Sequence, residues 1–197
     1  MNKPANVVVI GLGYVGLPLA LAFSKEIPTS GFDVDPSRVD ELRDGVDRNN
    51  ELSNAELTSS TLRLTKESSC ITDAEFIVVT VPTPITHSYE PDLSMLKSAS
   101  ELIGNRLRER DKNLSSAIVV FESTTYPGCT ESFCGPLIEK TSGLKSGVDF
   151  FLGYSPERTN FGDEIHTVET VVKVVSGQTP EVTELVSEIY GRVVQAG

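Results

Sequence analysis

The stretch from Val7 to Phe23, VVVIGLGYVGLPLALAF, limits the possible folds of this chain more than any other segment. A β-branched run comes first, at Val7–Ile10. The glycines Gly11, Gly13 and Gly16 follow it in the pattern G-x-G-x-x-G. Leucines and alanines, which favour helices, come next. A strand, a glycine turn and a helix in this order form the dinucleotide-binding fingerprint. The stretch therefore predicts the start of a nucleotide-binding domain.

Two other interpretations compete for the same uncharged stretch. Lys3, the apolar run and the small residues around Ala20 together resemble a secretory signal peptide. A membrane span requires roughly 20 apolar residues, and here glycines and a proline interrupt a shorter run. Because the glycine spacing favours the fingerprint over both, we expect a cytoplasmic protein without a membrane segment.

Charge and cysteine usage narrow the possible partners. The 197 residues carry a formal net charge of −11, whereas binding to nucleic acid or to anionic membranes needs clustered Lys and Arg. We therefore expect neither partner. The cysteines Cys70, Cys129 and Cys134 fit neither a disulfide scaffold nor a common zinc spacing, so we predict buried or half-buried thiols and no metal site.

Short apolar runs alternate with helical patterns along the chain. The expected strands are Asn6–Ile10, Ser30–Asp33, Leu62–Thr65, Phe76–Val81, Ala117–Glu122, Phe150–Tyr154 and Val171–Ser176. The expected helices are Tyr14–Lys25, Pro36–Gly45, Asp92–Arg110, Cys129–Ser142 and Pro180–Tyr190. Several strands are continuously apolar, which is typical of strands with helices on both faces. The alternation predicts an α/β fold with a doubly wound, mainly parallel Rossmann-type sheet, in one NAD-binding domain over residues 1–197.

A carboxylate stands where the fingerprint requires one. Asp33 ends the second expected strand, and at this place a carboxylate accepts hydrogen bonds from the ribose hydroxyls of NAD. Its charge also repels the 2′-phosphate of NADP. Asp35 we interpret instead as the N-cap of the next helix. The glycine turn is expected to bring the backbone N–H groups at Tyr14 and Val15 close to the pyrophosphate.

Three polar segments follow apolar strands, at the strand ends where ligands bind in parallel sheets. They are Val81–Pro84, Glu122–Gly128 and Tyr154–Arg158. Each segment alone is compatible with an ordinary polar loop. Together they predict a polar crevice beside the cofactor, in which Thr83 offers a hydroxyl group. Periodicity and spacing identify no substrate.

Five motifs in this order resemble the UDP-sugar 6-dehydrogenase family, which includes the UDP-glucose and UDP-N-acetylhexosamine dehydrogenases. The motifs are GLGYVGLP at Gly11–Pro18, GFDVD at Gly31–Asp35, VPTP at Val81–Pro84, ESTTYPG at Glu122–Gly128 and SPERTNFGD at Ser155–Asp163. The resemblance covers essentially the whole chain and is greatest for the UDP-N-acetylhexosamine branch. It implies a homo-oligomeric enzyme that oxidises a C6 alcohol to a carboxylate for polysaccharide biosynthesis, in two hydride transfers to NAD.

The resemblance also implies roles for particular residues. Thr124 would hold a water molecule, and Glu157 would be the general base that activates water for hydrolysis of a thioester intermediate. Arg158 would lie near the UDP-sugar substrate or a domain interface. With the residues above, the expected cofactor-binding residues are Gly11, Gly13, Tyr14, Val15, Gly16, Asp33, Arg38, Pro82, Thr83, Ser123 and Thr124.

The sequence departs from the family pattern in two respects. The nucleophilic cysteine of the family lies in a GFGGxCxPKD-like segment, which this chain lacks together with the central helix and the UDP-binding domain. Cys129 could substitute because it follows Gly128 near an expected helix start, but we favour a buried thiol. Phe161 occupies the place of a second family carboxylate after Glu157. We therefore expect this chain to bind NAD without turnover.

Two other functions remain as alternatives. The N-terminal domain of another β-hydroxyacid-type dehydrogenase would share the architecture, although the STTYPG and SPER segments argue against it. A free-standing NAD-responsive binding module would need a finished surface at its C-terminal end. At that end we expect Val193 and Val194 to form an exposed apolar patch instead.

Overall fold

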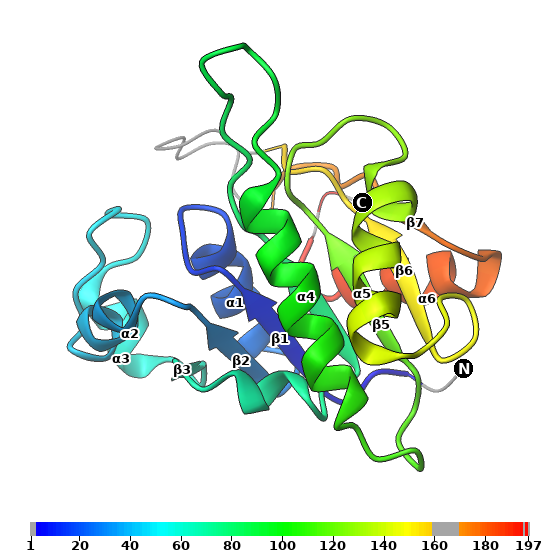
Figure 1. Ribbon diagram of the computed structural model, residues 1–197. Coiled ribbons are helices and arrows are strands. Elements are labelled where there is room, and N and C mark those ends of the chain that lie inside the picture. Colours follow the sequence, from blue (N-terminus) through cyan, green and yellow to red (C-terminus); the bar gives the residue numbers. More distant parts are fainter. Residues whose placement is uncertain (1–2, 159–169, 195, 197) are drawn as a thin grey trace.

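Alternate residues of strand β1 (Val7–Ile10) point into two different hydrophobic cores. The first and third residues belong to a core that helices α1 (Gly16–Ser24) and α6 (Pro180–Tyr190) cover. The second and fourth belong to a core under α4 (Ser94–Arg108) and α5 (Gly135–Ser142). The computed structural model, which describes residues 3–158, 170–194 and 196, therefore has helices on both faces of one sheet (Figure 1).

The sheet has seven strands in the order β3-β2-β1-β4-β5-β6-β7. After β1 they are β2 (Thr29–Phe32), β3 (Arg63–Thr65), β4 (Phe76–Val79), β5 (Ala117–Phe121), β6 (Phe150–Tyr154) and β7 (Ser176–Gly177). Every neighbouring pair is parallel except β6 and β7. The strand order reverses between β1 and β4, and ligands bind at such a reversal. The predicted doubly wound, mainly parallel sheet is confirmed.

Two helices begin at residues whose side chains cap them, and the first of these caps, Asp35, is the predicted one. Asp35 caps α2 (Pro36–Arg43), and its carboxylate accepts a hydrogen bond from the backbone N–H of Ser37 at 2.9 Å. Gly45, just beyond this helix, has a φ of +77°, a conformation that favours glycine. Thr179 caps α6 in the same manner, by accepting from the N–H of Val182 at 3.3 Å.

The expected strand Val171–Ser176 is wrong over most of its length. Of the expected strand, only Ser176 lies in a strand. Together with Gly177 it forms β7, which pairs with β6 in the antiparallel direction. Continuing the same register would bring Val174 opposite Pro156, which has no backbone N–H to donate to the ladder. The segment before β7 therefore runs past the end of β6 without regular pairing.

The expected helix Cys129–Ser142 is divided. It begins as a π-helix, Thr130–Cys134, and becomes α-helical only at α5. Pro136 lacks the N–H that an α-helix needs at this position, which favours a locally widened turn. Two short elements were not expected, α3 (Asn54–Ser59) and the 3₁₀ helix Ser68–Ile71.

The burial of the cysteines and of the last valines can be compared with what the sequence predicts. Cys129 and Cys134 are buried and Cys70 is half-buried, and all three are free thiols, as predicted. Val193 and Val194 are 5% and 6% exposed and pack in the core under α1 and α6, so the expected apolar patch is wrong.

Within the described part of the chain, no helix is both long and apolar enough to cross a membrane.

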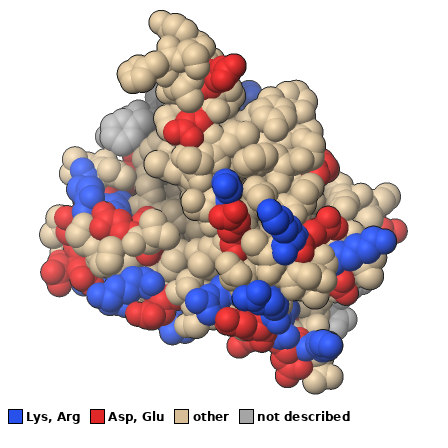
Figure 2. Space-filling view, in the orientation of Figure 1, with Lys and Arg blue, Asp and Glu red and all other residues tan. Residues whose placement is uncertain are grey.

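The charged side chains are unevenly distributed on the face seen in Figure 2. Acidic and basic residues are intermixed over the lower half of this face, while the loop between β4 and α4 at its top is largely uncharged (Figures 1 and 2). Ile85 and Tyr89 in this loop are exposed. The loop projects beyond the carboxyl ends of the strands, next to the site described below.

Candidate active site and cofactor cavity

A cavity of about 790 Å³ lies at the carboxyl ends of β1, β2, β4 and β5. Helix α4 closes one side through Ser94, Met95 and Ser98. The predicted residues that line the cavity are Gly11, Gly13, Tyr14, Val15, Asp33, Pro82, Thr83, Ser123, Thr124 and Glu157. The structure thus brings together side chains from four separate loops, as expected for the crevice of a doubly wound sheet.

The glycine turn is shaped by contacts that exclude larger side chains. Gly11 has a φ of +95°, and a Cβ atom at Gly16 would lie 1.9 Å from the carbonyl oxygen of Gly11. Thr80 fastens this arrangement to β4, because its hydroxyl donates to the same carbonyl at 2.8 Å. A Cβ atom at Gly13 would meet nothing within 4 Å. Gly16 therefore lets the helix start pack closely, while Gly13 leaves the cavity side of the turn open.

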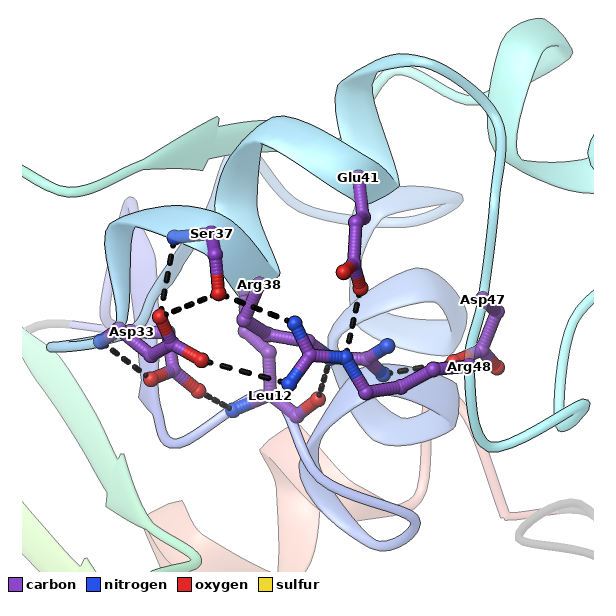
Figure 3. A network of polar contacts seen from close by, with 8 residues as sticks. Leu12, Asp33, Ser37, Arg38, Glu41, Asp47 and Arg48 are labelled. Carbon is purple, nitrogen blue, oxygen red and sulfur yellow. Dashed lines mark hydrogen bonds and ion pairs between the residues drawn. The ribbon is translucent and has the colours of Figure 1, made fainter.

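Asp33 is tied to this turn (Figure 3). One carboxylate oxygen accepts from the backbone N–H of Leu12 at 2.7 Å, and the other accepts from the N–H of Asp35 at 2.9 Å. A carboxylate has about four lone-pair positions, so both oxygens can accept further hydrogen bonds from a ligand. The end of β2 and the glycine turn are thus held in one fixed geometry, with an anionic acceptor on the cavity wall.

Arg38 has a different place from the one expected. It does not line the cavity and is only 4% exposed. Its Nε donates to the carbonyl oxygen of Leu12 at 2.8 Å, and its guanidinium pairs with Asp47 at 2.7 Å (Figure 3). Burial disfavours the charge of Asp47, but the bond from Arg38 and backbone N–H groups outweigh it and lower the pKa of this carboxyl. Arg38 therefore supports the glycine turn from behind.

Two hydroxyl groups join the loops that follow β4 and β5. Thr83 donates to the carbonyl oxygen of Thr124 at 2.5 Å, and Ser123 donates to the carbonyl oxygen of Val81 at 2.5 Å. Both hydroxyl oxygens can still accept a hydrogen bond from a ligand. The side chain of Thr124 is exposed along the cavity wall. The polar segments that the sequence predicts to converge are thus cross-linked at the centre of the site.

A buried charged cluster adjoins the cavity through Glu122 and Glu157, and sequence reasoning did not identify it. Glu122 follows β5 and is 1% exposed, yet it lines the cavity. The ammonium group of Lys173 lies 2.7 Å from Glu122 and 2.9 Å from Glu157. The hydroxyl of Tyr190 donates to the second oxygen of Glu122. We call these four residues the Glu122 cluster.

Burial governs the protonation of this cluster. It raises the pKa of Glu122 to about 7, and the nearby charge of Lys173 opposes this effect without cancelling it. Burial also disfavours the charged form of Lys173, but the two carboxylates outweigh burial and raise its pKa. At neutral pH the cluster therefore holds a charged lysine beside a carboxyl group that is near its titration midpoint.

The remaining expected residues lie outside the cavity wall. Arg158 is exposed, and its backbone N–H donates to Glu157 at 2.6 Å. Cys129 is 1% exposed in the core under α4 and α5, which leaves it without access to a substrate. Phe161 lies outside the described residues. Among the described residues, no group of three or more His, Cys, Asp or Glu side chains is placed to hold a metal ion.

The glycine turn, the tethered Asp33 and the converging loops are the parts of a dinucleotide site. Residues 5–194 match the NAD binding domain of the UDP-glucose/GDP-mannose dehydrogenase family. The chain belongs to this family. Its cofactor is accordingly NAD, and membership of the family confirms the resemblance inferred from the five motifs.

Relatives of this family domain are considerably longer than the chain. Protein CapL of Staphylococcus aureus is 48% identical over 197 residues, which are 100% of this chain and 45% of CapL. The UDP-N-acetyl-D-glucosamine 6-dehydrogenase of Pseudomonas aeruginosa is 47% identical over 196 residues, 99% of this chain and 45% of that enzyme. The crystal structure of an NDP-N-acetyl-D-galactosaminuronic acid dehydrogenase from Methanosarcina mazei Go1 matches with a TM-score of 0.85 at 27% identity, over 100% of this chain and 43% of that one. The chain spans less than half the length of these relatives.

Proposed function

We propose that the chain is the NAD-binding part of an enzyme that oxidises the C6 alcohol of a UDP-N-acetylhexosamine to a uronate in two NAD-dependent steps. The observation that carries the proposal is one cavity that is lined by Asp33 after β2, by Thr124 after β5 and by Glu157 after β6. The sugar class is supported by a relative at 47% identity that is named a UDP-N-acetyl-D-glucosamine 6-dehydrogenase. Assembly as a homo-oligomer and a cytoplasmic location belong to the same proposal.

The residues that line the cavity suit a dinucleotide bound in one particular orientation. The open side of Gly13 and the N-terminus of α1 suit a pyrophosphate, because unpaired N–H groups at a helix start attract anions. Asp33 suits the ribose hydroxyls of the adenosine half. The nicotinamide half would then extend toward Thr83, Ser123 and Thr124. When bound, NAD supplies the acceptor for a hydride from the sugar carbon.

The part of the cavity that Thr124 and Glu157 line suits the handling of water and protons. In the proposal, the exposed hydroxyl of Thr124 positions a water molecule, and Glu157 accepts a proton from it. The carboxylate of Glu157 is well placed for this role, because Lys173 holds one oxygen at 2.9 Å and the N–H of Arg158 holds the other at 2.6 Å. We place the side chain of Arg158 toward the substrate.

The proposal assigns no nucleophilic thiol to this chain. Cys129 and Cys134 are buried and Cys70 is half-buried, and none of them lines the cavity. Burial raises the pKa of Cys134 to about 12 and that of Cys70 to about 11, so both thiols stay protonated at neutral pH. We infer that the chain by itself binds NAD but does not release NADH when a UDP-sugar is added.

Calorimetric titration of the chain with NAD and NADP tests the cofactor site. We expect NAD to bind, NADP to bind far more weakly, and Asp33→Ala to weaken NAD binding by about tenfold or more, since two charge-assisted hydrogen bonds to ribose are lost. Asp44→Ala, which removes an exposed carboxylate beyond α2, is the matched control and should bind NAD normally. Equal binding of NAD by the Asp33 variant and the wild type would contradict the assignment.

A further inference from the structure

Leu12, in the middle of the glycine turn, is held at both of its backbone polar groups (Figure 3). Its N–H donates to the carboxylate of Asp33 at 2.7 Å, and its carbonyl oxygen accepts from Nε of Arg38 at 2.8 Å. Leu12 is fully buried, and Arg38 lies behind the turn without lining the cavity. The carbonyl bond of Leu12 therefore points into the protein and away from the cavity.

This direction also decides where the next N–H group points. In a trans peptide unit, the carbonyl oxygen and the N–H of the following residue lie on opposite sides of the C–N bond. The N–H of Gly13 therefore points away from Arg38. Gly13 lines the cavity, and a Cβ atom on it would meet nothing within 4 Å. Among the described residues, no protein group accepts a hydrogen bond from this N–H, so a ligand in the cavity can accept it.

Arg38 is itself fixed by Asp47, at the start of the loop between α2 and α3. The guanidinium pairs with this carboxylate at 2.7 Å, and the side chain of Asp47 is 0% exposed. The same carboxylate accepts hydrogen bonds from the backbone N–H groups of Asn49 at 3.1 Å, Glu51 at 2.8 Å and Leu52 at 3.1 Å. The loop thus closes around Asp47 and presents a rigidly held anion to Arg38.

We propose that Asp47 is a positioning residue for the cofactor: through Arg38 it holds the carbonyl of Leu12 away from the cavity and so directs the N–H of Gly13 toward the pyrophosphate. This inference rests on the proposed function, which places the pyrophosphate beside Gly13. Neither Asp47 nor Arg38 contacts the cofactor in this assignment. Both act on its affinity through the orientation of the peptide unit that joins Leu12 to Gly13.

A purely electrostatic role for Asp47 would have the opposite sign. Its carboxylate balances the buried positive charge of Arg38. Loss of this balance would leave a cation near the glycine turn, which attracts the negatively charged pyrophosphate. Positioning therefore predicts weaker binding when Asp47 loses its charge, whereas simple attraction predicts tighter binding. The sign of the change in affinity separates the two roles.

Titrations of the ¹⁵N-labelled chain with adenosine, ADP and NAD, followed by NMR, test the assignment, because adenosine lacks the pyrophosphate. Asp47→Asn keeps the size of the side chain and removes its charge. We expect this variant to bind ADP and NAD about tenfold more weakly, the value of one hydrogen bond to a charged group, and to bind adenosine as the wild type does. Asp44→Asn, which removes an exposed carboxylate beyond α2, is the matched control and should bind all three normally.

Arg38→Lys tests the second link of the chain of contacts. Lysine keeps a positive charge beside Asp47 but lacks the Nε–H that holds the carbonyl of Leu12. The same selective loss of ADP and NAD affinity is expected, with adenosine affinity unchanged. In the wild type, the amide proton of Gly13 should shift strongly when ADP is added and little when adenosine is added.

Three results would overturn the inference. They are unchanged or tighter binding of ADP by the Asp47 variant, a loss of affinity that extends equally to adenosine, and an amide of Gly13 that does not respond to ADP. The second result would show a general structural effect. Should neither variant fold, the response of Gly13 in the wild type still decides whether its N–H faces the pyrophosphate. A wild type that binds neither ADP nor NAD is distinguishable from these results, because it contradicts the proposed cofactor site itself and the inference with it.

Discussion

Gly13 and Gly16 lie in one turn, yet a methyl group would meet very different surroundings at each. At Gly16 it would lie 1.9 Å from the carbonyl oxygen of Gly11 and 2.3 Å from the hydroxyl of Thr80. At Gly13 it would meet nothing within 4 Å and would project into the place proposed for the pyrophosphate. The same motif thus contains one glycine needed for packing and one needed for the ligand.

This difference predicts opposite results for two alanine substitutions. Gly16→Ala should lower the free energy of unfolding by about 3 kcal/mol, because backbone must move to relieve the overlap. Gly13→Ala should change it by less than about 1 kcal/mol and should weaken NAD binding by about tenfold. Urea denaturation and calorimetry measure the two effects. A stable Gly16 variant, or a Gly13 variant with normal affinity, would contradict these assignments.

Helix α3 shows how hydrogen bonds at its N-terminus can stabilise a short polar helix. Its only buried residue is Leu57, so little packing stabilises it. A capping box does so instead: the N–H of Glu56 bonds to the hydroxyl of Ser53 at 3.3 Å, and the N–H of Ser53 bonds back to the carboxylate at 2.8 Å. The bonds from Ser53 also hold the pKa of Glu56 below its usual value.

Removal of this cap should loosen α3 locally. Ser53→Ala is expected to cost about 1 kcal/mol and to speed hydrogen exchange of the amides in α3. Ser59→Ala, at the exposed C-terminal end of the same helix, loses only a weak 3.4 Å bond and serves as the control. Equal exchange rates in the two variants would show that the cap does not hold the helix.

The sequence predicts elements well where local pattern and packing agree, and poorly where distant residues decide. The apolar runs at β1, β4 and β5 are buried throughout, as expected of strands covered on both faces. The S-x-x-E signal of α3 was present but lacked an apolar face to support it. The strand expected before Ser176 fails because Pro156 belongs to its partner, which no local window contains.

The same limit applies to the site. The spacing between Gly11 and Asp33 predicts a carboxylate beside the glycine turn, and the two are joined through Leu12 at 2.7 Å. No spacing rule links Glu122 with Lys173, which are 51 residues apart in the sequence and 2.7 Å apart in the fold. Arg38 is close to Asp33 along the chain, but its side chain turns toward Asp47 and away from the cavity.

At the scale of the whole molecule, the Glu122 cluster joins segments that are distant along the chain. It connects the ends of β5 and β6 with the segment before β7 and with α6. The ring of Tyr190 also packs edge to face against Phe23 and Phe76, which belong to α1 and β4. The site and the core under α1 and α6 therefore share one residue, so protonation in the cavity affects the stability of the entire fold.

This connection predicts how unfolding depends on pH. Burial raises the pKa of Glu122 from 4.5 to about 7, so the folded state favours the protonated form. The stabilisation is full below about pH 4.5 and is lost as the pH rises through 7, a change of roughly 3 kcal/mol. Glu122→Gln has no such loss, and its unfolding free energy should therefore improve relative to the wild type across this range. Urea denaturation from about pH 4.5 to about pH 8 measures the difference. Glu184→Gln, at an exposed position on α6, should follow the wild type. Parallel curves for the Glu122 variant and the wild type would mean that this carboxyl group titrates normally in the fold.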